Sequence, residues 1–220
     1  MDSMLMDTGY NPTKKEELAG GIIHGIGAGL SLAGLIILIV LTCGTGDAWK
    51  MASFGLYGSS LIILYLASTV YHIVSNPRIK SLFHYIDHAA VFLLIAGTYT
   101  PFCLITIRGW WGWSIFFIVW GIAILGIVFK YFFIGRFRIA STILYLLTGW
   151  IIVIAVKPLI ETLPAGGLKW IILGGACYTT GIIFFAWKKL PFSHFIWHVF
   201  VLAGSIFHYF GVLFYVLPAP

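Results

Sequence analysis

Charged residues are scarce in this sequence. Lys, Arg, Asp and Glu together make up only 9% of its 220 residues, whereas water-soluble domains carry about 25%. The hydrophobic share is 60% and the mean hydropathy is +1.01, so a soluble fold would expose more apolar surface than water tolerates. The scarcity of charge excludes a soluble domain and indicates that lipid is the solvent for most of the chain.

Cysteine is equally scarce. Cys43, Cys103 and Cys177 form neither a paired framework nor a Cys-x-x-Cys motif, so the thiols predict no disulfide scaffold. The net charge of +6 does not indicate a nucleic-acid partner, because the basic residues fall singly or in pairs between apolar runs. Aromatic residues, in contrast, make up 17% of the chain, and tryptophan and tyrosine gather where a bilayer meets water.

Seven long apolar runs dominate the chain, separated by short connections with glycine and proline. Each run is long enough to cross about 30 Å of hydrocarbon at 1.5 Å per residue, although the fifth is short. Since lipid-exposed backbone must satisfy its own hydrogen bonds, we expect the runs to be helices. The prediction is an all-α, seven-transmembrane-helix bundle over residues 20–217, after an N-terminal cytoplasmic segment of residues 1–19. The predicted spans are 20–42, 52–74, 84–107, 112–129, 139–156, 168–187 and 192–217.

Basic residues decide the predicted orientation, because lysine and arginine accumulate in cytoplasmic loops. One side of the predicted bundle holds nine of them: Lys14, Lys15, Arg78, Lys80, Lys130, Arg136, Arg138, Lys188 and Lys189. The other side holds four: Lys50, Arg108, Lys157 and Lys169. We therefore expect the N-terminus in the cytoplasm, the C-terminus outside, and a multi-pass location in the inner (plasma) membrane.

Ionisable residues inside apolar spans are costly in lipid and mark candidate functional sites. His72 ends the second predicted span, and Asp87 lies near the start of the third. His194 and His198 begin the seventh span. In the predicted topology these three helix ends lie on the cytoplasmic side, so the four side chains are expected at one membrane depth.

The spacing of His194 and His198 is typical of a metal site, because residues four apart project from one helix face. His72 would complete a set of three imidazoles that suits zinc and leaves a fourth position for water. Asp87 would then act either as a fourth ligand or as a general base. Ser68 lies one turn before His72, where its hydroxyl can hydrogen-bond a substrate carbonyl or water.

Other histidines in the spans have simpler explanations, since a histidine in a bundle often only donates a hydrogen bond between helices. His208 follows His198 by ten residues, about 15 Å deeper, and is expected to be a polar partner in the core. His84 or His88 could replace a ligand. His24, with Glu17 seven residues earlier, is expected either to support the site from outside the ligand set or to pack locally.

The motifs together resemble a known family. Ser68-x-x-x-His72, Asp87 within Ile-Asp-His-Ala-Ala, and Ser193-His194-x-x-x-His198 before His208-Tyr209-Phe210-Gly211 resemble the hemolysin III proteins, which belong with the progestin and adipoQ receptor family. The resemblance covers nearly the whole chain. It departs at Gly20 and Ile23, where Asn and Thr are expected. It implies zinc bound by His72, His194 and His198, with Asp87 and Ser68 beside the metal, and a role in membrane lipid homeostasis.

Two classes of function stay open at this point. One is a zinc-dependent, ceramidase-like membrane hydrolase that cleaves a lipid amide or ester. The other is a non-enzymatic protein, either a lipid-responsive regulator with structural zinc or an oligomeric pore-forming hemolysin that causes cytolysis. A pore through one chain would need a continuous polar stripe along a helix, and the spans offer only scattered polar residues. The predicted partners are membrane lipids or a lipid substrate.

Overall fold

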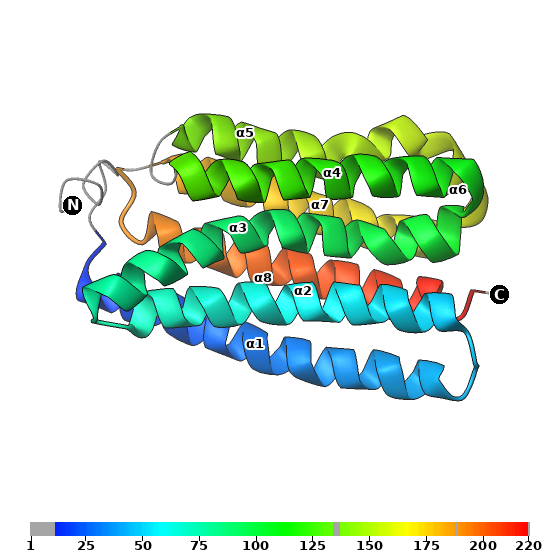
Figure 1. Ribbon diagram of the computed structural model, residues 1–220, viewed down its shortest axis with the longest axis horizontal. Helices are drawn as coiled ribbons and strands as arrows, with labels where there is room; N and C mark the ends of the chain where they lie inside the picture. The colour runs from blue at the N-terminus through cyan, green and yellow to red at the C-terminus, as the bar shows by residue number, and fades with distance from the viewer. Residues whose placement is uncertain (1–11, 134–136, 188, 220) are drawn as a thin grey trace.

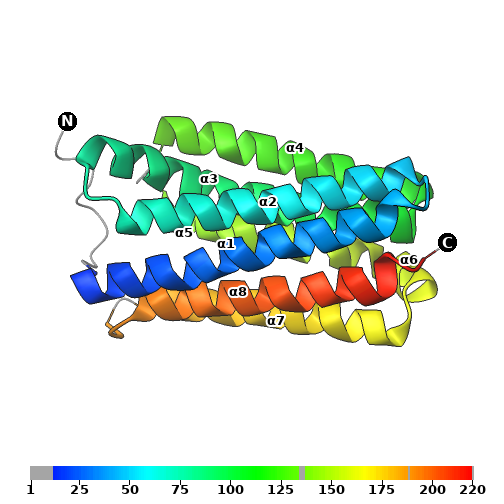
Figure 2. The ribbon, with the colours of Figure 1, turned by 90° about the horizontal axis from the view of Figure 1, so that it is seen from below.

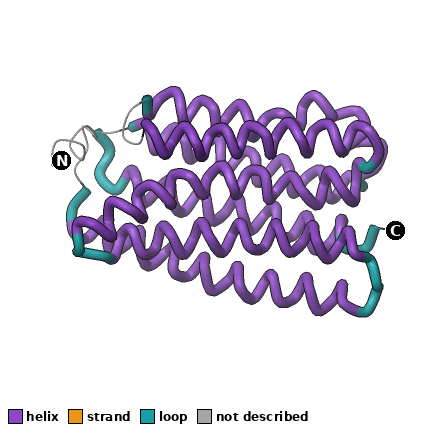
Figure 3. The backbone as a smooth tube through the Cα atoms, in the orientation of Figure 1, coloured by secondary structure: helices purple, strands orange, loops and turns teal. Residues whose placement is uncertain are grey.

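The protein is a bundle of long helices in the computed structural model, which describes residues 12–133, 137–187 and 189–219. All of its regular elements in these ranges are helical (Figure 3). Seven helical spans are long and apolar enough to cross a membrane, which confirms the predicted all-α seven-span architecture. The elements are α1 (Lys14–Cys43), α2 (Ala48–Ile73), α3 (Pro77–Pro101) with a π-helical extension η2 (Phe102–Ile107), α4 (Gly109–Phe133), α5 (Arg138–Gly149), the 3₁₀ segment η3 (Trp150–Ala155), α6 (Val156–Thr162), α7 (Ala165–Ala186), and α8 (Ser193–Gly211) with a π-helical extension η4 (Val212–Val216).

Two helices begin well before their apolar runs. α1 starts at Lys14, six residues ahead of the predicted span, because Thr13 and Glu16 form a capping box in which each side chain bonds the other residue's backbone N–H. α3 starts at Pro77, where the Asn76 side chain caps the free N–H groups of the first turn. Of the predicted N-terminal segment, residues 1–11 lie outside the described residues.

The spans run alternately between two ends of the bundle (Figure 1). We call the end where α1, α3 and α8 start and α2 stops the site end, and the opposite one the far end. The described basic residues of the predicted cytoplasmic side share the site end, while Arg136 and Lys188 lie outside the described residues. The side of the membrane that each end faces stays a prediction.

Packing is uneven across the bundle. The most extensive contacts join α2 to α3, α1 to α2 and α7 to α8, and α1 also lies against α8 (Figures 1 and 2). Many large apolar side chains on the outer surfaces are exposed, among them Leu125 at 71% and Ile139 at 78%. In a bilayer these surfaces face lipid, which is as apolar as they are.

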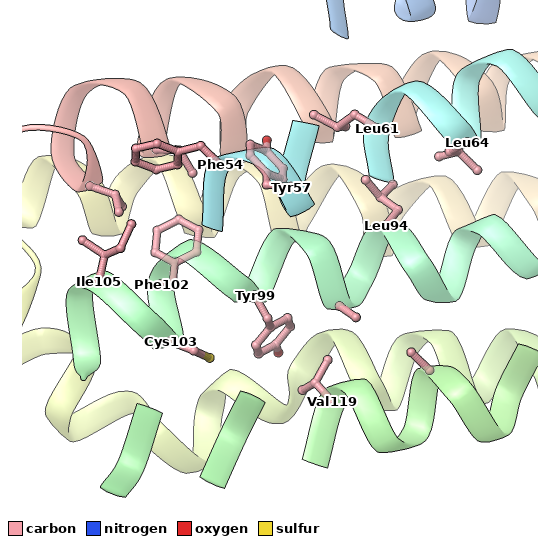
Figure 4. Close-up of a cluster of buried hydrophobic side chains, with 14 of the residues drawn as sticks. Phe54, Tyr57, Leu61, Leu64, Leu94, Tyr99, Phe102, Cys103, Ile105 and Val119 are labelled. Atoms are coloured by element: carbon pink, nitrogen blue, oxygen red, sulfur yellow. The ribbon is translucent and has the colours of Figure 1, made fainter. Parts of the chain in front are cut away.

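The interior of the far half is filled by large apolar side chains. Phe54 and Leu61 of α2 meet Leu94 of α3, Phe102 of η2 and Val119 of α4 in a continuous buried cluster (Figure 4). All five side chains are at most 5% exposed. The far half is therefore a packed core between these helices, and the buried histidines and carboxylates lie towards the site end.

The fifth span is broken by a side chain from α3. The Tyr99 hydroxyl donates a hydrogen bond to the carbonyl oxygen of Gly149 at 2.7 Å and accepts one from the N–H of Ile152 at 2.8 Å. A side chain inserted into the backbone ladder is a recognised cause of helix distortion. It accounts for the change from α5 to the 3₁₀ segment η3 at Trp150.

A glycine sets the closest approach between α2 and α3. A Cβ atom at Gly97 would lie 2.1 Å from Ser60 Oγ and 2.6 Å from Ser60 Cβ. We expect Gly97→Ala to destabilise the protein by about 1–3 kcal/mol through overpacking, measured by thermal unfolding in detergent with tryptophan fluorescence. Gly55→Ala on α2 is the control, because nothing lies within 4 Å of its Cβ position. Equal stability of the two variants would contradict the close contact.

The predicted orientation can be tested by cysteine labelling at two exposed positions, one at each end of the bundle. Thr45 lies in the connection from α1 to α2, and Ser75 in that from α2 to α3. In a Cys43→Ser background, an impermeant maleimide added to intact cells should label Thr45→Cys and spare Ser75→Cys, since the site end carries most of the basic residues. The Cys43→Ser protein without an introduced cysteine is the negative control. The reverse pattern of labelling would place the N-terminus outside.

Candidate metal centre

Three imidazoles from two helices meet at the site end. His72 lies in the last turn of α2, and His194 and His198 lie in the first turns of α8. One ring nitrogen from each lies within 4.8 Å of the others. The Nε2 atoms of His72 and His198 are 2.9 Å apart. Three of the four residues that the sequence placed at one depth, the histidines, thus come together in space.

Two contacts from α1 hold the start of α8 in place. Phe192, just before α8, has a left-handed backbone with φ of 60°, and its N–H donates a hydrogen bond to the Glu16 carboxylate. Four residues further along α1, Gly20 lies against the rings: a Cβ there would be 3.3 Å from His198 Cδ2 and 3.5 Å from His72 Cδ2. The absence of a side chain at Gly20 lets α1 pass close to the triad.

The triad suits a transition-metal ion. Three imidazoles are ligands that zinc, copper, iron and nickel accept, and the group contains no thiolate. Nitrogen ligands of a tetrahedral zinc ion lie about 3.3 Å apart, so the 2.9 Å between two of the nitrogens is within a few tenths of an ångström of that spacing. His72 and His198 are buried and His194 is half-buried. The three histidines could therefore hold a metal ion.

Glu17 lies behind His72, and Lys80 holds it there. One Glu17 carboxylate oxygen is 2.6 Å from Lys80 Nζ and 3.5 Å from His72 Nδ1. Lys80 also donates to the backbone carbonyl of Tyr71 at 3.2 Å. The arrangement joins α1, α2 and α3, and it places a carboxylate beside the ring nitrogen of His72 that faces away from the triad. Metal-ligating histidines commonly have such a partner.

Asp87 and Ser68 lie beside the triad. Asp87 is 8% exposed and Ser68 is fully buried. The Asp87 carboxylate is close enough to His72 for an electrostatic interaction, and the Ser68 hydroxyl has no hydrogen-bond partner among the described residues. Among the described residues, the group whose ligand atoms lie within 4.8 Å of one another contains only the three histidines. Asp87 is therefore a neighbour of that group and not a member of it.

His24 forms part of the wall of the site, whereas His208 lies elsewhere. The His24 ring is 3.8 Å from the ring of His198, and neither of its nitrogens makes a hydrogen bond to a residue that the structure describes. His208 donates from Nε2 to the carbonyl oxygen of Ile171 at 3.2 Å. It is a polar partner between α7 and α8, as the sequence indicated, and it takes no part in the triad.

Sequence reasoning missed two polar features near the site. The first is Lys80, which resembles an ordinary orientation signal at a helix end. The second is a buried network in which the hydroxyls of Tyr65 and Tyr178 each lie 2.7 Å from Ser205 Oγ, with the Tyr65 ring 5.0 Å from that of His24. Tyrosine and serine are too common in spans for their pairing to be read from the sequence.

Fold and site together define a class: a seven-span helical membrane protein with a histidine triad near one end of the bundle. Residues 13–209 match the protein family described as haemolysin-III related, so the chain belongs to that family. The match confirms the family resemblance of its motifs.

The relatives cover almost the whole chain. It is 52% identical over 204 residues to Hemolysin-3 of Bacillus cereus, with 93% of each protein covered. It is 48% identical over 208 residues to the Hemolysin-3 homolog of Bacillus subtilis (strain 168), covering 94% of this chain and 98% of that protein. The human monocyte to macrophage differentiation factor is 27% identical over 217 residues, covering 96% and 89%. No solved structure matches the chain.

The triad predicts metal in the purified protein. We expect about one zinc ion per chain by elemental analysis and its loss in the double variant His194→Ala/His198→Ala, because two of three imidazoles are removed. His208→Gln is the control, since glutamine keeps a donor for the Ile171 carbonyl and lies away from the triad. Equal zinc in the double variant and the control would rule out the site.

Proposed function

We propose that the protein is a zinc-dependent membrane hydrolase that cleaves an amide or ester bond of a lipid. The observation that carries the proposal is the triad with a buried carboxylate and a buried hydroxyl beside it. Three neutral protein ligands leave room at the ion, which is typical of catalytic zinc sites, while structural sites use four protein ligands. Zinc bound there would supply a Lewis acid at the carbonyl of the substrate.

Each side chain of the site has a role in this reaction. His72, His194 and His198 hold the ion, and Glu17 keeps the His72 ring oriented through Nδ1. Asp87 takes the proton of the water that attacks the carbonyl carbon and returns it to the leaving amine or alcohol. Ser68 donates a hydrogen bond to the carbonyl oxygen as negative charge develops on it.

The position of the triad suits a lipid substrate. It lies at the site end, where helix ends reach water, whereas the far half is apolar. A lipid could place its acyl chain along the bundle and its amide or ester linkage at the level of the histidines. Such an activity would change membrane composition, and we propose a role in lipid homeostasis of the inner (plasma) membrane.

The competing function is non-enzymatic. Two relatives are named Hemolysin-3 and Hemolysin-3 homolog, names that favour cytolysis by a pore. The packed apolar cluster of Phe54, Leu61, Leu94, Phe102 and Val119 opposes a water-filled channel through one chain. A pore would then have to form between chains, and the triad would serve as a structural or regulatory metal site.

Asp87→Asn separates catalysis from metal binding. We expect the variant to keep its zinc but to lose about 10²–10⁴-fold of the rate of fatty-acid release from ceramide in nanodiscs, because asparagine cannot accept the proton. A lysophospholipid in the same assay tests ester cleavage. Asp47→Asn is the matched control, because Asp47 caps α2 at the far end, away from the triad, and asparagine is an equally good cap. Unchanged turnover in Asp87→Asn would remove its catalytic role, and no turnover of either lipid by the wild type would favour the non-enzymatic function.

A further inference from the structure

Histidine is concentrated at one end of the molecule. Of the seven histidines in the chain, all but His208 lie at the site end. The triad uses three, and His24 packs against one of them. His84 and His88 on α3 stay outside both roles, although the same helix also contributes Asp87.

His84 and His88 form a pair with its nitrogens directed at each other. The two residues are one helical turn apart, and their Nε2 atoms are 3.1 Å apart. Their rings are nearly perpendicular, at 82°, with centroids 4.7 Å apart. Both side chains are half-buried. Two imidazoles four residues apart on a helix can share one ion without any change of the backbone.

Neighbouring helices fix the turn that carries the pair. The Tyr145 hydroxyl of α5 donates a hydrogen bond to the His88 carbonyl oxygen at 2.8 Å. Between the two histidines, the Tyr85 hydroxyl bonds the Ile127 carbonyl oxygen of α4 at 3.4 Å. The pair is therefore held in place before any ion arrives, which lowers the cost of binding.

The pair is also a neighbour of the triad. The Tyr71 ring contacts both groups, with its centroid 5.1 Å from that of His84 and 4.8 Å from that of His72. An ion on the pair would thus lie beside the triad, and the half-buried pair is more accessible than the buried His72 and His198.

We propose that His84 and His88 form a second, weaker binding site for zinc, from which the ion passes to the triad. The transfer exchanges nitrogen ligands one for another and leaves the charge of the ion unchanged. With one imidazole fewer, the pair binds zinc more weakly than the triad. The second site stands on its own geometry, while its role in loading rests on the proposed zinc triad.

Radioactive zinc and equilibrium dialysis of the full, metal-stripped chain in detergent test the second site. We expect two classes of zinc site in the wild type. His84→Gln/His88→Gln should lose only the weak class, and His194→Ala/His198→Ala only the tight class. Retention of the tight class shows that the glutamine variant is folded, and the single variant His84→Gln provides a milder test if it is not.

The outcomes distinguish the two proposals. A single tight class in the wild type, or a weak class that persists in the glutamine variant, would overturn the second site and leave the triad intact. A weak class that responds to His84 and His88 without any tight class would overturn the zinc triad alone. The transfer is tested by measuring how fast zinc returns to the triad of the metal-stripped protein. We expect zinc to return more slowly in His84→Gln/His88→Gln than in the wild type, and equal rates would overturn the transfer.

Discussion

A bilayer tolerates an ionisable side chain only where another polar group meets it, and this constraint organises the bundle. The histidines near the site end have polar or aromatic neighbours from a second helix or from their own, and Glu17 lies between His72 and Lys80. Away from that end the interior is mainly apolar, although serine, threonine and tyrosine side chains are buried there as well. The helices are consequently held in register at one end by polar contacts and along the rest of their length by close packing.

The site depends on helix ends more than on helix faces. α8 begins where the Glu16 carboxylate accepts a hydrogen bond from the N–H of Phe192. α3 begins where the Asn76 side chain caps its first turn. Because α1 carries Glu16, Glu17 and Gly20 within two turns, a single helix positions α8, supports His72 and leaves space beside the rings. The N-terminal turns of α1 are thus as much a part of the site as the histidines are.

Much of this arrangement could be predicted from the sequence. Long apolar runs give the spans, and counting them brings the ends of α2, α3 and α8 to one level. The sequence alone could not tell two similar patterns apart. His84 with His88 and His194 with His198 have the same spacing, and only the approach of His72 on α2 to His198 on α8 gives one pair a third imidazole. The extra turns of α1 could have been read from Thr13 and Glu16, whereas the Tyr99 contact with the fifth span joins residues about fifty positions apart and has no local signal.

That contact changes the pitch of the fifth span. The span runs from Ile139 to Thr162, and its 24 residues in regular α-helix would reach about 36 Å, which already exceeds the hydrocarbon core. A 3₁₀ segment rises about 2.0 Å per residue instead of 1.5 Å, so the six residues of η3 lengthen the span by about 3 Å. A single tyrosine on a neighbouring helix thus alters both the length of the fifth span and the direction in which its later side chains project.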